Sequence, residues 1–153
     1  MTAGGTKSFA FDDPSLSSTC EGCGAIMHRA VGEALHGGRR HWHVEATCED
    51  CGNGWINCGS DDPPPGVRDA LIAAYGWSTV RVGAGSVGRG ALLLKCVREV
   101  YGGSLAEARQ TADALRASGV QGTQVDAEIL AGALRRAGFP AEIMSGSREG
   151  GAK

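Results

Sequence analysis

The 153-residue chain is long enough for one ordinary domain or two small ones, and its 42% hydrophobic and 21% charged residues exclude a chain that is disordered by composition or embedded in a membrane. The net charge is −2, and the first 60 residues carry four basic and seven acidic residues. This balance argues against a duplex-DNA-binding protein, because such proteins owe much of their affinity to the neutralisation of phosphates.

The location of the protein is predicted from its apolar segments. No apolar run approaches the roughly 20 residues that cross a bilayer, and residues 1–11 lack the apolar core of a signal peptide. We therefore expect a cytoplasmic protein. In a reducing compartment its six cysteines indicate metal ligands or buried thiols rather than disulfides.

Changes in composition divide the chain into parts. Residues 1–17 are a polar leader and residues 147–153 a polar tail, both expected to be flexible. The run Asp61-Asp62-Pro63-Pro64-Pro65 is the strongest break, because proline lacks a backbone donor and has a fixed φ. We therefore predict a cysteine-rich module over 18–60, a linker with a short helix at 65–75 over 61–76, and a second domain over 77–146.

Two elements are predicted between the cysteine pairs of the first module. Residues 25–35 show a weak helical spacing of apolar side chains, and Gly37-Gly38 predicts a turn. Residues 41–47 alternate in polarity, which predicts a strand with Trp42, Val44 and Ala46 on one face.

Two short cysteine motifs carry the clearest chemical signal. Cys20-Glu-Gly-Cys23-Gly24 and Cys48-Glu-Asp-Cys51-Gly52 repeat one pattern. A Cys-x-x-Cys turn brings two thiolates within reach of one ion at about 2.3 Å, and the glycine after it accepts the positive φ of the turn. Together the motifs predict a closed site for one structural Zn²⁺, with Cys20, Cys23, Cys48 and Cys51 as ligands. Residues 18–60 thereby resemble the zinc ribbon family.

Other readings of the cysteines and histidines stay open. A thioredoxin-like redox site lacks its strand–helix context here and needs only one pair. Cys58, just past the second motif, is an alternative ligand, whereas Cys96 falls in a helical stretch as a small buried residue. The histidines are further candidate ligands. Among them His41 and His43 share a face of their strand, as a second metal site requires, although exposed strand histidines are commoner. The full set is His28, His36, His41 and His43.

The second domain begins with a strand pattern at 77–82 and a helical pattern at 91–101. The apolar stripe of this helix consists of Leu93, Val97, Val100 and Tyr101. Between them, Gly83-Ala-Gly85-Ser-Val-Gly88 matches a phosphate-binding loop pattern. Too few residues follow for a dinucleotide-binding sheet, and no acidic residue ends a second strand. We therefore interpret the segment as a flexible surface loop.

Three more elements follow the Gly102-Gly103 turn. Ser104 and Glu107 form a capping-box pattern that opens a second helix, whose predicted inward residues are Leu105, Ala108, Ala112 and Leu115. A short strand at 120–125, a third helix at 126–137 and a closing strand at 139–144 complete a β-α-α-β-α-β order. This order predicts an α+β fold, a two-layer sandwich with helices on one face of a small sheet.

The stretch Leu94-Lys-Cys-Val-Arg-Glu-Val-Tyr-Gly-Gly-Ser-Leu-Ala-Glu-Ala-Arg109 is similar to a helix, glycine turn and second helix of a known family. With the helix and strand of 126–143, it makes residues 78–144 resemble the C-terminal domain of the bacterial ribosomal large-subunit stalk protein. In that family the first two helices recruit translational GTPases. The resemblance implies a partner-binding surface made of Lys95, Arg98, Leu105, Glu107 and Arg109.

The chain also departs from that family. Gly90 stands where the pattern has an important lysine, and Gly102-Gly103-Ser104 replaces a Gly-Leu-Gly turn. The cysteine module replaces the helices that anchor the stalk to the ribosome. We therefore expect that the fold is reused for another purpose, since a shared fold does not transfer function.

These observations favour a non-catalytic adaptor or regulator that uses the zinc ribbon as a scaffold and presents a helical face to a protein partner. The alternative is a nucleic-acid-associated regulator whose ribbon contacts phosphates and stacks bases, through Arg39, Arg40, His41, Trp42 and His43. A small accessory enzyme is the third hypothesis. It is disfavoured because no catalytic triad, Cys/His pair or carboxylate pair stands out.

Overall fold

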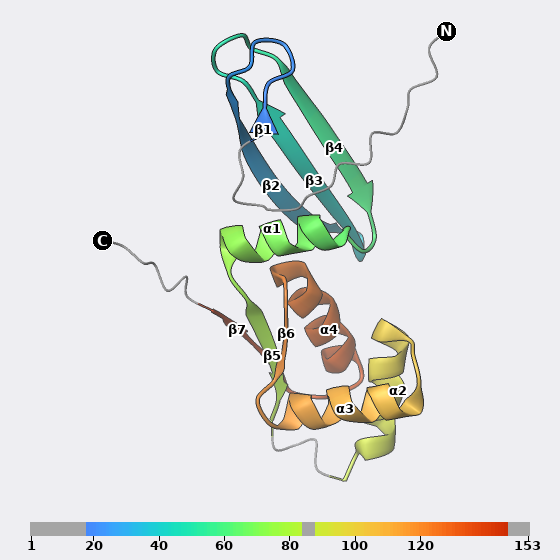
Figure 1. Cartoon of the computed structure of the whole chain (residues 1–153). Helices are drawn as coiled ribbons and strands as arrows, with labels where there is room; N and C mark the ends of the chain where they lie inside the picture. Colours follow the sequence, from blue (N-terminus) through green and yellow to red (C-terminus); the bar gives the residue numbers. More distant parts are fainter. Residues whose placement is uncertain (1–17, 84–87, 147–153) are drawn as a thin grey trace, which may run out of the picture. The chain divides into compact units, whose positions relative to one another are not determined.

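The computed structural model describes residues 18–83 and 88–146, and it has the predicted α+β fold (Figure 1). The leader 1–17, the tail 147–153 and positions 84–87 of the glycine-rich loop lie outside the described residues. The chain divides into two compact units. The first runs to Glu33 and resumes over His41–Ala74, and the second consists of Ala34–Arg40 and the chain from Tyr75 onward.

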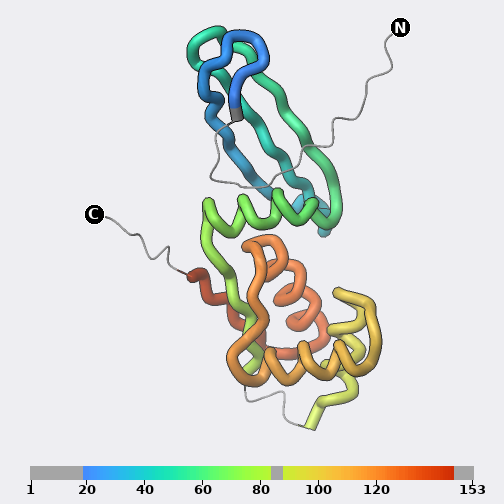
Figure 2. The backbone as a smooth tube through the Cα atoms, in the orientation of Figure 1, coloured from blue at the N-terminus to red at the C-terminus, as the bar shows by residue number. Residues whose placement is uncertain are grey.

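The first sheet has four strands in the order β1-β2-β3-β4, and Figure 2 follows its backbone along the chain. These strands are β1 (Ser18–Thr19), β2 (Ile26–His36), β3 (Arg39–Thr47) and β4 (Gly54–Ser60). The side chains of β3 alternate between exposed and buried along its whole length, as the sequence predicts. Gly37 and Gly38 both have positive φ and form the predicted turn between β2 and β3.

Strand β2 corrects the helical expectation for residues 25–35. Its helix-favouring Ala and Leu residues are outweighed by a period-2 pattern, in which Met27, Val31 and Leu35 face the same side. Arg29 shares that side, and its guanidinium lies 6.0 Å from the ring centroid of Trp55. The aliphatic part of a long charged side chain can thus take an inward strand position. Pairing with the neighbouring strands therefore determines that this segment forms a strand and not a helix.

Helix α1 (Pro65–Tyr75) belongs to the first unit through residue 74. Its Val67 and Leu71 are buried in one cluster with Trp42 and Val44 of β3. The segment predicted as a linker with a short helix therefore completes the core of the first unit.

The second unit contains the predicted β-α-α-β-α-β order. A three-stranded antiparallel sheet in the order β6-β5-β7 has β5 (Ser78–Val82) at its centre, flanked by β6 (Val120–Gly122) and β7 (Ala141–Ser145). The helices are α2 (Gly90–Tyr101), α3 (Leu105–Arg116) and α4 (Gln124–Arg136). Val80 and Val82 of β5 join the helices in one core cluster, which places that core on one face of the sheet.

Two apolar residues at the ends of the helices depart from the predicted inward stripes. Leu93 and Val97 of α2 are buried, but Tyr101 in its last turn is 51% exposed. Leu105, the first residue of α3, is 46% exposed. Helix α3 begins with the predicted capping box, in which Glu107 N–H donates to Ser104 Oγ and Ser104 N–H donates to the Glu107 carboxylate. This cap starts the helix without requiring Leu105 to be buried.

The C-terminal end of α4 is capped from a distance by Arg89. Its guanidinium donates to the carbonyl oxygens of Ala137 and Gly138 at 3.0 and 2.9 Å, and lies 4.4 Å from the ring centroid of Phe139. A cation at this position also interacts favourably with the negative end of the helix dipole. Within residues 18–83 and 88–146, no helix combines the length and the apolar character needed to cross a membrane.

Replacing Arg89 by alanine should loosen the second unit. We expect Arg89→Ala to cost about 1–2 kcal/mol, because two charge-assisted hydrogen bonds and a cation–π contact are lost. Amide hydrogen exchange within α4 measures this loss locally. Arg109→Ala, an exposed arginine on α3, is the matched control, and equal exchange rates in the two variants would contradict the role given to Arg89.

Candidate metal centre

The two cysteine motifs form two loops with the same backbone geometry. In the first, Cys20 N–H donates to Ala25 O at 2.7 Å and Gly24 N–H donates to Cys20 O at 2.9 Å. In the second, the N–H groups of Cys48 and Gly52 make the corresponding bonds at 2.7 and 2.9 Å, to Asn53 O and Cys48 O. The glycine that follows each motif has a φ of +75° or +74°, as the sequence predicts. The two loops therefore hold their cysteine side chains in matching orientations.

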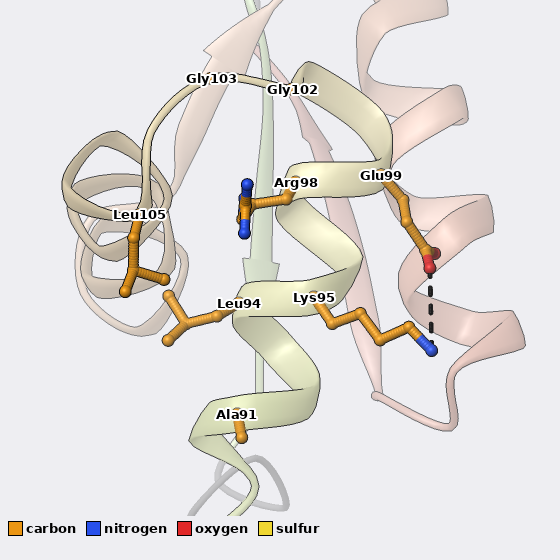
Figure 3. A pocket seen from close by; sticks show the side chains of 8 residues that line it. All are labelled: Ala91, Leu94, Lys95, Arg98, Glu99, Gly102, Gly103 and Leu105. Atoms are coloured by element: carbon orange, nitrogen blue, oxygen red, sulfur yellow. Dashed lines mark ion pairs between the residues drawn. The ribbon is translucent and has the colours of Figure 1, made fainter.

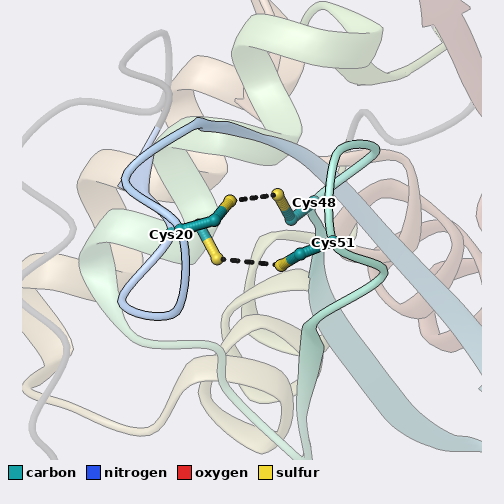
Figure 4. A group of neighbouring side chains, drawn as sticks. Cys20, Cys48 and Cys51 are labelled. Atoms are coloured by element: carbon teal, nitrogen blue, oxygen red, sulfur yellow. Dashed lines mark hydrogen bonds between the residues drawn. The ribbon is translucent and has the colours of Figure 1, made fainter.

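The loops bring all four thiols to one point (Figure 4). The sulfur atoms of Cys20, Cys23, Cys48 and Cys51 lie within 4.8 Å of one another. Cys20 Sγ is 3.6 Å from Cys51 Sγ, and Cys23 Sγ is 3.5 Å from Cys48 Sγ. A disulfide needs about 2.05 Å, whereas tetrahedral metal–sulfur bonds of about 2.3 Å place their sulfurs roughly 3.8 Å apart. This group of cysteines can hold one metal ion.

Burial separates the ligands into two classes. Cys20 and Cys48 are buried and pack with Met27 and Ala46, while Cys23 and Cys51 are exposed. Each motif thus contributes one sulfur from the core of the unit and one from its surface. The metal-binding group is continuous with the small apolar cluster beside it.

Hydrogen bonds prepare Cys20 to act as a thiolate. The backbone N–H groups of Cys23 and Gly22 lower the pKa of Cys20 to about 6. The side-chain amide of Asn53 also donates to Cys20 Sγ, at 3.8 Å. Hydrogen bonds to a charged form favour that form, so they favour the thiolate of Cys20.

The two exposed thiols behave in the opposite way. An amide hydrogen bond from Ala25 lowers the pKa of Cys23, but the adjacent Cys48 and Cys51 thiols outweigh it and raise that pKa to about 12. An amide hydrogen bond from Asn53 lowers the pKa of Cys51, but the neighbouring Cys20 and Cys48 thiols and burial together outweigh it and raise that pKa. Like charges gathered in one place disfavour ionisation. A bound cation removes this penalty, and the residues present therefore fit a metal ion.

Cys58 and Cys96 are not part of this group. Cys58 is exposed on β4, and Cys96 is buried in the core of the second unit, where burial raises the pKa of its thiol. The four histidines lie at exposed positions of β2 and β3. Among the described residues, the four cysteines of the two motifs are the group whose ligand atoms converge.

The residues considered for nucleic-acid contact alternate between the two faces of β3. Arg39, His41 and His43 are exposed, whereas Arg40 and Trp42 are only 5% and 9% exposed. The Trp42 ring packs against α1, and the Arg40 guanidinium forms an ion pair with Asp126. The structure does not bring these five side chains to one surface, and Trp42 offers no exposed ring face for stacking on a base.

Three of the residues considered for partner binding line one groove on the second unit (Figure 3). Lys95 and Arg98 of α2 and Leu105 of α3 border a space of about 550 Å³. Glu107 is instead committed to the cap of α3, and Arg109 lies outside the lining. Leu94, which had not been singled out for contact with a partner, also lines the groove. Its position one turn before Arg98 is the signal that points to it.

The metal-binding affinity of the four-cysteine group should fall steeply as pH falls. Without an ion, Cys23 and Cys51 are protonated at neutral pH because their pKa values are raised, so each releases a proton when an ion binds. Each displaced proton contributes a factor of ten per pH unit. We therefore expect at least about a hundredfold loss of Zn²⁺ affinity per pH unit below pH 7. Below about pH 6 the loss should steepen, as Cys20 also becomes protonated.

Competition with a chromophoric chelator at several pH values measures this slope. Cys96→Ala, which removes a thiol outside the group, should follow the wild-type curve. An affinity that does not change with pH would contradict thiolate ligation.

Comparisons of the chain with known proteins gave no match. It matches no protein-family model and no curated protein, and it matches no solved structure. Its function must therefore be inferred from its own residues and their arrangement.

Proposed function

We propose that the chain is a non-catalytic, zinc-containing adaptor in which one Zn²⁺ stabilises the first unit and the groove between α2 and α3 of the second unit docks a protein partner. The groove is the main observation in favour of partner binding. The convergence of four thiols is the observation in favour of a bound zinc ion.

The ligand set favours zinc. Four cysteines in two Cys-x-x-Cys loops match the donor set of structural zinc sites, and thiolates select soft or borderline cations over calcium or magnesium. Four protein ligands leave no position for water or substrate, so the ion has a structural role. The core clusters of this unit are small, with Met27 and Ala46 beside the two buried cysteines. A bound ion supplies stability that so small a core does not provide.

The groove combines an apolar floor with basic residues. Ala91 and Leu94 of α2 and Leu105 of α3 supply its apolar side chains. In Figure 3, Leu94 and Arg98 point from α2 toward Leu105, whereas Lys95 turns the other way toward Glu99. Lys95 Nζ lies 4.0 Å from Glu99 Oε1. Arg98 is therefore the cation directed into the space between the two helices.

This arrangement suits one kind of partner. An apolar side chain of the partner would lie between Leu94 and Leu105, and a neighbouring carboxylate would accept hydrogen bonds from the Arg98 guanidinium. Arginine is suited to this role because its planar donors match a carboxylate in a bidentate way. The partner segment is thus expected to carry a large apolar residue next to Asp or Glu.

Metal analysis of the purified chain tests whether it binds a structural zinc ion. We expect one tightly held Zn²⁺ per chain, and a strong chelator or Cys48→Ser should unfold the first unit while the second unit keeps its helical signal. Cys96→Ala should keep the ion. A first unit that stays folded after zinc is removed would contradict the structural role.

Selection from a displayed peptide library tests the groove. Enriched peptides should carry the apolar–acidic pair and bind at least about tenfold more weakly, or ~1.4 kcal/mol, to Leu105→Glu and to Arg98→Glu. Leu92→Glu is the matched control, because Leu92 is 38% exposed on the same helix and does not line this groove. Peptides that bind all three variants equally would contradict the site.

A further inference from the structure

The histidines of the chain are concentrated on one short hairpin. All four occur in β2 and β3, at exposed positions. In β3, His41 and His43 are two residues apart, and successive residues of a strand point to opposite faces. Their side chains therefore leave the same face of the sheet, while Trp42 between them enters the core.

The neighbouring strand places a thiol opposite this pair. In the antiparallel register of β3 and β4, His43 faces Cys58 and His41 faces Ser60. Directly opposed residues in such a pair have Cβ atoms about 4.5–5.5 Å apart. Cys58 is exposed, like both histidines. His41 already leans toward β4, since its Nδ1 lies 3.2 Å from Ser60 Oγ.

We propose that His41, His43 and Cys58 form a second metal site, on the exposed face of the first sheet, for a cation that accepts imidazole and thiolate ligands, such as Zn²⁺. This site goes beyond the structural zinc and the docking groove. It depends on neither of them.

The site is separate from the four-cysteine group. His43 precedes Cys48 by five residues, which at about 3.3 Å per residue places it roughly 16 Å away along the extended strand. One ion cannot bridge such a distance, because metal–ligand bonds are about 2.0–2.3 Å long.

Closure of the second site requires the His43 side chain to move. The His43 ring now lies over Gly32 of β2, where an added Cβ would be 3.0 Å from Nε2 and closer still to Cε1. The absence of a side chain at Gly32 lets the ring lie there. A change of rotamer turns the imidazole toward Cys58, and exposed side chains interconvert between rotamers readily.

Three protein ligands give this site a different chemistry from the four-cysteine group. On binding, Cys58 loses its thiol proton to solvent and forms a metal–sulfur bond, while each histidine binds through a neutral ring nitrogen. The fourth position of a tetrahedral ion remains open to water. An ion held on an exposed face by three ligands exchanges faster than one enclosed by four thiolates.

The number of bound ions tests the proposal. Protein with its four-cysteine group loaded is titrated with Zn²⁺ against a chromophoric chelator, and the wild type should bind a second, weaker equivalent. Cys58→Ser, His41→Gln and His43→Gln should each lose this second equivalent and keep the first. Two matched controls, His36→Gln on the same hairpin and Cys96→Ala for a thiol elsewhere, should keep both equivalents.

A second measurement on the wild type does not depend on how the variants fold. Alkylation of Cys58, followed by mass spectrometry, should slow when the second equivalent of Zn²⁺ is added. A single equivalent in the wild type, a second equivalent that survives Cys58→Ser, or an alkylation rate unaffected by Zn²⁺ would each overturn the proposal.

Discussion

The convergence of four thiols on one point is the constraint on which the first unit depends. Two loops with the same hydrogen bonds hold these sulfurs within 4.8 Å of one another. The same crowding raises the pKa values of Cys23 and Cys51. Without a cation these two thiols stay protonated, and a bound cation would favour all four thiolates and cross-link the two loops. Folding and metal binding would then form a single equilibrium.

The apolar clusters in the rest of the first unit are small. One cluster packs beside the cysteines, and a second unites Trp42 and Val44 with Val67 and Leu71 of α1. Trp42 lies so close to Gly59 that a Cβ there would be 2.8 Å from its Cε2. A large ring thus packs directly against the backbone of β4. Helix α1 covers this ring, which explains why the core of the ribbon extends past the proline-rich segment.

Sequence patterns predicted the features that depend on local chemistry. Cysteine spacing, the glycine turns and the capping box at Ser104 each need only a few neighbouring residues, and each is present in the structure. Features set by distant partners were missed. Residues 25–35 form a strand because they pair within a sheet, and β4 went unpredicted because its inward positions include Asn57 and Gly59. The groove depends on how α2 packs against α3, which the pattern of either helix alone does not contain.

Leu105 is half exposed at a position where the helix cap does not require an apolar side chain. The cap of α3 is complete through Ser104 and Glu107, and the buried face of this helix is supplied by Ala108, Ala112 and Leu115. A polar residue at position 105 would also start the helix, although it would give up the buried part of a side chain that is 46% exposed. Yet an exposed leucine stands there, beside Leu94 and within reach of the basic Arg98. Its place at the edge of the space that also receives the Arg98 side chain is the feature on which the proposed docking role rests.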